Sequence, residues 1–233
     1  MTGEMTRRFR GLEMAREGLI FAKTLLGAQS RYDIIKSWRV DFSMSEVKGS
    51  VFLNVARLVR ANKDVDWKKY LNDKDLEIIH GQILASSRYP LDTYERAEIA
   101  VFREIGKGQL ENARQWGRFM MENMFKTVYH DLVRDQDPAL ALERFALIVR
   151  MLYRFNDPKF EALKYVKMPG DRARIIVKSD HPVREFEAHS HQSMGTIEKL
   201  VELSGGKDVK IEITECDWQN DNPFALLDVS WKK

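Results

Sequence analysis

Cysteine is almost absent from this chain, since its 233 residues include only Cys216. A single cysteine excludes a disulfide framework and any metal centre built from several thiolates, and it is typical of a reducing compartment. Cys216 closes a predicted strand, and no base accompanies it in the sequence. We therefore interpret it as a small buried hydrophobic residue rather than a nucleophile.

The sequence also lacks a hydrophobic run long enough to cross a bilayer. Its most apolar N-terminal stretch, residues 19–28, is interrupted by Lys23 and is far shorter than the roughly 20 residues that a transmembrane helix needs. Glu13 and Glu17 precede this stretch, where a secretory signal would be basic. These observations predict a cytoplasmic protein without a transmembrane segment.

No dense basic tract is present either. The formal net charge is +3, and the first 70 residues hold 14 Lys or Arg against 8 Asp or Glu. An excess this dilute is typical of solvated helix faces. We therefore expect no nucleic-acid partner.

Recognised catalytic and cofactor-binding motifs are missing. Gly106-Lys107-Gly108 begins like a dinucleotide fingerprint, but Glu111 stands where the third glycine is required. Phosphate-binding loops, nucleophile elbows and zinc helices are also missing. His189 and His191 lie about 200° apart on a helix, so they cannot easily share a metal. We predict no catalytic, cofactor-binding or metal-ligating residues, and hence neither an enzyme nor a cofactor.

What is present is a long series of helical patterns. A stripe with spacings of three and four predicts an N-terminal helix that ends near Gly27; its members are Leu12, Ala15, Leu19, Ala22 and Leu26. A lone helix of this length is marginal in water, so the stripe must be covered. We interpret residues 1–45 as a helical arm and this stripe as an interface, packed either on the body of the protein or on another chain.

The next part of the chain, residues 46–160, is also predicted to be helical. A helix over residues 49–61 places Phe52, Val55 and Val59 inward, and Asn72 caps the next one. Further helices are predicted to begin with an Asp92/Glu95 capping box, to run from about 110 to 134, and to begin at Asp137-Pro138. Met120, Met121 and Met124 on the long helix are interpreted as core filler.

After residue 160 the hydrophobic period changes to two. Strands are predicted near 162–168, 173–178, 208–215 and 225–231, with one helix over 183–203 that ends at Gly205-Gly206. Six residues are expected to share one buried face: Ile175, Val177, Val209, Ile211, Val229 and Trp231. Helices followed by clustered strands define an α+β domain over 46–233, with an antiparallel sheet in 161–233 packed on helices.

Several short motifs, taken in order, resemble a paralogous family of proteins common in myxobacteria and other delta-type bacteria. They are Lys48-Gly49-Ser50-Val51-Phe52, Ser86-Ser87-Arg88-Tyr89-Pro90-Leu91, Leu203-Ser204-Gly205-Gly206-Lys207-Asp208-Val209, Glu215-Cys216 and Val229-Ser230-Trp231. The C-terminal half of that family is distantly similar to 4-vinyl-reductase domains, haem–nitric-oxide-binding domains and the Bet3-like subunits of a vesicle-tethering complex.

This resemblance implies helices on an antiparallel sheet, dimer formation and, in some branches, a pocket for an apolar molecule. Two departures are visible. Residues 217–224 lack the second cysteine that often follows the position of Cys216, and no haem-ligating histidine can be carried over. Residues 1–45 lie outside the resemblance.

Two functional hypotheses follow. The first, which the empty list of catalytic motifs and the N-terminal stripe favour, is a cytoplasmic adaptor that binds a protein partner or a second copy through the arm. The alternative is a sensor whose cleft between sheet and helices holds an apolar small molecule, as the methionine-rich helix and the relatives suggest.

Overall fold

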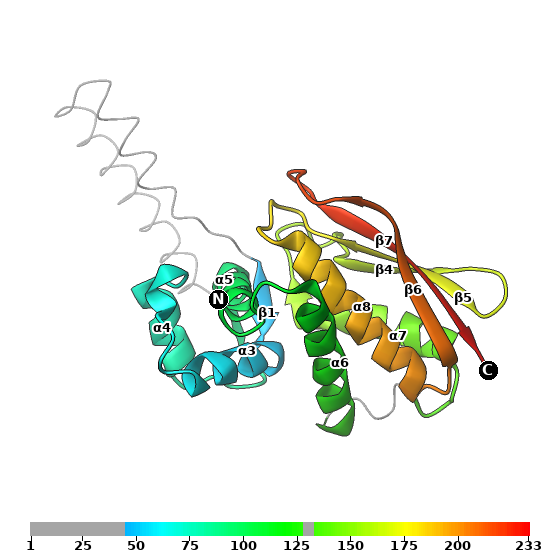
Figure 1. Ribbon diagram of the computed structural model, residues 1–233, viewed down its shortest axis with the longest axis horizontal. Helices are drawn as coiled ribbons and strands as arrows, with labels where there is room; N and C mark the ends of the chain where they lie inside the picture. Colours follow the sequence, from blue (N-terminus) through cyan, green and yellow to red (C-terminus); the bar gives the residue numbers. More distant parts are fainter. Residues whose placement is uncertain (1–44, 128–132) are drawn as a thin grey trace, which may run out of the picture. The chain divides into compact units, whose positions relative to one another are not determined.

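The described part of the chain begins with helices and ends with a four-stranded sheet (Figure 1). The computed structural model describes residues 45–127 and 133–233, with side chains described up to residue 124 in the first range. Residues 43–233 form one unit of the chain. The predicted N-terminal helix with its stripe from Leu12 to Leu26 lies outside the described residues, as does His130.

Helices account for most of the first part. They are α3 (Gly49–Ala61), α4 (Asp73–His80), α5 (Leu91–Glu104), α6 (Leu110–Thr127), α7 (Pro138–Leu152) and, within the sheet part, α8 (Phe186–Leu203). The bounds of α3 match the prediction, and Phe52, Val55 and Val59 are buried. None of the helices in the described residues is both long and apolar enough to span a bilayer.

Two of the predicted helix starts are confirmed by their hydrogen bonds. Asn72 and Asp75 form a reciprocal capping box at α4. At α7, the Asp137 carboxylate accepts hydrogen bonds from the backbone N–H groups of Ala139 and Leu140, with Pro138 in the first turn.

Two helix boundaries differ from the prediction. At α5, Pro90 is the N-cap and provides no side-chain hydrogen bond, so the Asp92/Glu95 capping box was wrong. Both carboxylates instead pair with side chains, Asp92 with Arg96 and Glu95 with His181. The long helix is described only to Thr127, and residues 133–135 are not α-helical, so the predicted extension to 134 was also wrong.

The large sheet has the strand order β4-β5-β7-β6 and is antiparallel throughout. Its strands are β4 (Leu163–Lys167), β5 (Arg172–Lys178), β6 (Lys207–Asp217) and β7 (Phe224–Lys232). The expected α+β class is therefore confirmed. A second, small sheet pairs β1 (Glu46–Lys48) with β2 (Arg88–Pro90) and β3 (Tyr153–Arg154), which sequence analysis missed.

One face of the large sheet carries the expected core residues. Ile175, Val177, Ile211, Val229 and Trp231 are buried, and α7 and α8 pack against the sheet. Val209 is only half-buried, because β6 is an edge strand with a register shift between Lys207 and Lys210.

Cys216 corrects another prediction, because its side chain is exposed rather than buried. It lies on the edge strand β6, beyond a second register shift between Ile213 and Glu215. The register shift sets Cys216 opposite the buried Ala225 of β7, but the sheet edge leaves the other side of β6 uncovered, so the cysteine side chain stays exposed.

Helices α6 and α8 meet without intervening side chains. A Cβ atom built on Gly195 would lie 1.9 Å from the Arg114 carbonyl oxygen, and one on Gly117 would lie 1.9 Å from that of Gln192. The Thr196 hydroxyl group also donates to the Gly117 carbonyl. Glycine at both positions therefore allows the two backbones to touch.

Candidate functional site

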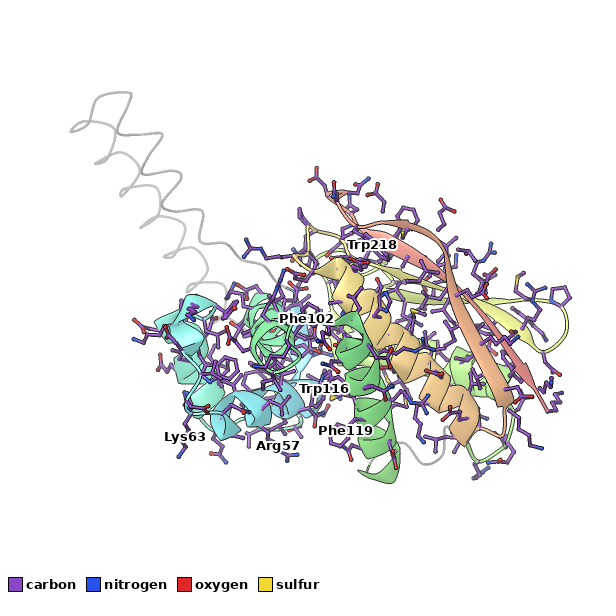
Figure 2. The ribbon with its side chains drawn as sticks, in the orientation of Figure 1. Arg57, Lys63, Phe102, Trp116, Phe119 and Trp218 are labelled. Atoms are coloured by element: carbon purple, nitrogen blue, oxygen red, sulfur yellow. The ribbon has the colours of Figure 1, made fainter. Side chains whose placement is uncertain are left out.

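A cavity of about 690 Å³ lies among the helices of the described residues. Most of its wall comes from α5, α6, α7 and α8, and the rest from α3, one end of the β4–β5 pair and the segment before α8. Figure 2 shows Phe102 of α5 and, on α6, Trp116 and Phe119 at the side where the two helices face each other. Cavities of roughly 300–1,000 Å³ with mostly apolar walls are typical of small-molecule sites.

Apolar side chains from four elements form most of the wall. Those that define its chemistry are Ile99, Phe102, Trp116, Met120, Met124, Phe145, Val149 and Leu163. Met120 and Met121 are buried, and all three methionines of the 120–124 cluster line the cavity. Thioether side chains adapt to irregular shapes, so this wall suits an apolar occupant.

A polar cluster crosses the cavity from α5 to α8 and is centred on Glu98. The Tyr94 hydroxyl group donates to Glu98 Oε1 at 2.7 Å, and the Gln192 side-chain amide donates to the same oxygen at 2.8 Å. His189 Nδ1 lies 3.8 Å from Glu98 Oε2. The Glu98 side chain is 14% exposed, so these partners are what makes a charge tolerable at this position.

The cluster shifts the pKa of both ionisable partners toward their charged forms. Burial alone would raise the pKa of Glu98, but His189 and the two hydrogen-bond donors outweigh it and lower that pKa. Burial alone would lower the pKa of His189, and the facing Glu98 carboxylate raises it instead. The pair therefore favours a carboxylate and an imidazolium.

A second bridge joins α5 to the segment that precedes α8. His181 Nε2 lies 3.0 Å from Glu95, and its Nδ1 lies 2.7 Å from Asp180. The hydrogen bond with Glu95 is the main cause that raises the pKa of His181 to about 9, against a smaller effect of burial. Arg103 of α5 pairs in turn with Glu185 at the start of α8.

Sequence analysis missed this cluster because it searched for ligand spacings and motifs along the chain. The stripe of the predicted interface lies outside the described residues, so the structure does not place it. One sequence signal could have revealed the cluster: Leu91, Tyr94 and Val101 are buried at helical spacing, and Glu98 takes the remaining position of that stripe. A carboxylate on an apolar stripe needs a partner, and His189 lies 91 residues further along the chain.

Comparisons with known proteins identify the fold. Neither a family model nor a curated protein matches the chain. Solved structures of H-NOX domains do match. A single-residue mutant of T. Tengcongensis H-NOX gives a TM-score of 0.56 at 13% identity, over 80% of this chain and 98% of that one.

Two other solved structures agree. An oxygen-binding H-NOX domain related to soluble guanylate cyclases, in its oxygen complex, gives a TM-score of 0.55 at 14% identity, over 78% of this chain and 92% of that one. A mutant of Cs H-NOX gives 0.56 at 15% identity, over 80% and 97%. At this identity the likeness establishes an H-NOX-like fold and leaves function to be argued from the site.

The fold raises the question whether the cavity residues suit a haem iron. Axial ligands are a neutral imidazole, a phenolate, a thiolate, or a thioether that accompanies histidine. Among the described residues, His189 is the one histidine in the wall, and its Nδ1 lies 3.8 Å from Glu98 Oε2. Burial raises the pKa of Tyr94 and Tyr153, with Glu98 adding to it, which keeps both phenols protonated. Within the described wall, His189 Nε2 is therefore the histidine nitrogen that could hold an iron, with the Glu98 carboxylate facing the other ring nitrogen as it commonly does behind a metal-bound histidine.

Proposed function

We propose that this domain is a sensor module that binds an apolar small molecule in the cavity between α5, α6, α7 and α8. The observation that carries the proposal is the cavity itself, with its volume of about 690 Å³ and its aromatic and methionine walls. The H-NOX-like fold supports it by analogy, because one of the matched structures is an oxygen-binding H-NOX domain. The mostly apolar lining of the cavity directs the proposal to an organic ligand.

The adaptor hypothesis depends on the arm of residues 1–45, which lies outside the described residues. We keep binding of a protein partner or a second copy through that arm as a separate prediction. Membership in the paralogous family named above is likewise proposed, on the short motifs alone. No contact among the described residues favours the adaptor over the sensor.

The test is to fill the cavity and ask whether binding of an apolar probe is lost. Ala113 is buried in the cavity wall on α6, so Ala113→Phe adds a ring where the ligand would lie. Leu147→Phe is the matched control, because Leu147 is 54% exposed on α7 and lies outside the cavity wall. Both variants should keep the unfolding transition of the wild type.

The probe is 1-dodecanol, followed by calorimetry on the full-length protein. We expect one molecule to bind the wild type and the Leu147→Phe variant, with at least tenfold weaker binding to Ala113→Phe. Equal binding by all three proteins, or no binding by the wild type, would contradict the proposal. An absorbance band of bound haem in the purified protein would contradict the choice of an organic ligand.

A further inference from the structure

The α8 wall of the cavity differs in chemistry from the other walls. His189, Gln192, Ser193 and Thr196 line the cavity at spacings of three and four, so they form one polar strip along the helix. The facing parts of α6 and α7 contribute mostly methionine and aromatic or aliphatic side chains. A ligand in this cavity therefore has an apolar environment on most sides and a polar one along α8.

Part of this polar strip is already used by the protein. The Gln192 amide donates to Glu98, and the Thr196 hydroxyl group donates to the carbonyl oxygens of Gly117 and Gln192. His189 Nε2 and Ser193 Oγ, in contrast, have no hydrogen-bond partner among the described residues. In the part of the chain that the structure describes, the buried side-chain polar atoms without a partner are on Arg88, Trp116 and Trp231. His189 Nε2 and Ser193 Oγ are not among these buried atoms, so both reach open space.

We propose that the ligand is an amphiphile whose carboxylate is bound by His189 Nε2–H and Ser193 Oγ–H, while its hydrocarbon part lies against the methionine and aromatic walls. This deepens the proposed function and rests on it. Two donors one helical turn apart on the same helix face can each donate to one oxygen of a carboxylate, which accepts at both oxygens. Because the Glu98 carboxylate favours the imidazolium form of His189, the hydrogen bond from Nε2 is assisted by charge.

The charges around the strip permit an anion. Three carboxylates line the cavity, and each has a cationic partner: Glu98 faces His189, Glu95 pairs with His181, and Glu185 pairs with Arg103. Arg184, an exposed residue of the cavity wall, has no carboxylate partner among the described residues. His189 thus lies between Glu98 and the proposed ligand carboxylate, and Arg184 adds a positive charge to the wall that no carboxylate of the described residues pairs with.

The test compares three probes that share one hydrocarbon chain: dodecanoate, 1-dodecanol and dodecylammonium, each below its aggregation concentration. Calorimetry on the full-length wild type should rank dodecanoate about tenfold tighter than 1-dodecanol, with dodecylammonium weakest. His189→Gln removes the charge but keeps a donor, and Ser193→Ala removes the second donor without adding bulk. Each variant should reduce the preference for dodecanoate over 1-dodecanol to about threefold or less.

His191→Gln is the matched control, because His191 lies on the same helix but not in the cavity wall. It should keep the wild-type preference. Tight binding of 1-dodecanol with no preference for dodecanoate would overturn this inference and leave the proposed function standing. A preference that survives both His189→Gln and Ser193→Ala would also overturn it. Failure of all three probes to bind the wild type would overturn the proposed function and this inference together.

Discussion

Helix α8 contacts α6 on one side and α5 on another, and the two contacts are built differently. Against α6 the backbones touch at Gly117 and Gly195, and Arg114 and Arg118 pair with Glu198 and Glu202 along the crossing. Against α5 the link is made by long polar side chains, chiefly through Glu98.

The two contacts differ because the domain is tightly packed between α6 and α8 and encloses a cavity between α5 and α8. Backbone contact leaves no volume, so the α6–α8 pair is a fixed unit. Polar bridges hold α5 at a distance from α8, and the cavity occupies the space that remains. We therefore expect substitutions at the first contact to act on stability, and substitutions at the second to act on stability and ligand binding together.

The largest effect should follow Gly195→Ala. Alanine favours a helix over glycine by about 1 kcal/mol, so the substitution would stabilise α8 if there were room. The added Cβ instead meets the Arg114 carbonyl oxygen at 1.9 Å, and separating the helices should cost about 3 kcal/mol. Urea unfolding measures this; Ser193→Ala on the same helix is the control and should stay near wild type. A stabilised Gly195→Ala variant would refute the close contact.

Glu98→Gln should have the next largest effect. The amide keeps the size of the side chain, but it removes the counter-charge of His189 and weakens the bonds from Tyr94 and Gln192. A loss of about 2 kcal/mol is expected from hydrogen bonds to a charged group, together with a lower pKa of His189 in an NMR titration. Glu212→Gln, on the exposed face of β6, serves as the control. An unchanged His189 pKa would mean that the pair does not exist.

The His181 bridge should make stability depend on pH. The pKa of His181 is raised to about 9 in the folded protein, so its stabilisation is fully present below the ordinary pKa of about 6.5 and is lost as pH rises through 9. Because the side chain is 36% exposed, we expect about 1 kcal/mol at most. Urea midpoints between pH 6 and 10 should fall in the wild type and fall less in His181→Gln. If the urea midpoint falls equally with pH in the wild type and in His181→Gln, groups other than His181 cause the pH dependence.

The smallest effect should come from Arg118→Met. Arg118 forms ion pairs with Glu198 and Glu202, and its own side chain is 25% exposed. Ion pairs near the surface contribute about 0.5 kcal/mol to the free energy of unfolding. The change in melting temperature should shrink further at high salt, because salt screens exposed charges. A loss comparable to that of Gly195→Ala would show that charge rather than backbone contact holds α6 to α8.

Sequence reasoning succeeded where the signal is local. The stripe of Phe52, Val55 and Val59 predicts α3, and Asp137-Pro138 predicts the start of α7, because each depends on neighbours within two helical turns. The alternation of Ile175 and Val177 predicts β5 for the same reason. Clustered strands after helices then suffice for the α+β class.

Sequence reasoning failed where a strand or side chain pairs with residues that are distant in the chain. Val47 of β1 pairs with Tyr89 and Tyr153, in segments of three and two residues that carry no periodic signal of their own. Glu95 was assigned to a capping box because its partner His181 lies 86 residues away. The cavity was expected only as an alternative, from the methionine-rich helix and the family resemblance, because an open volume depends on how far apart α5 and α8 are held.

Native mass spectrometry of the full-length protein tests the central claim most directly. Our account predicts that the wild type, purified under mild conditions or mixed with 1-dodecanol, retains one organic molecule that is released on unfolding and that Ala113→Phe does not retain. A wild type that carries no small molecule under either condition, or one that carries a mass equal to haem, would contradict the account.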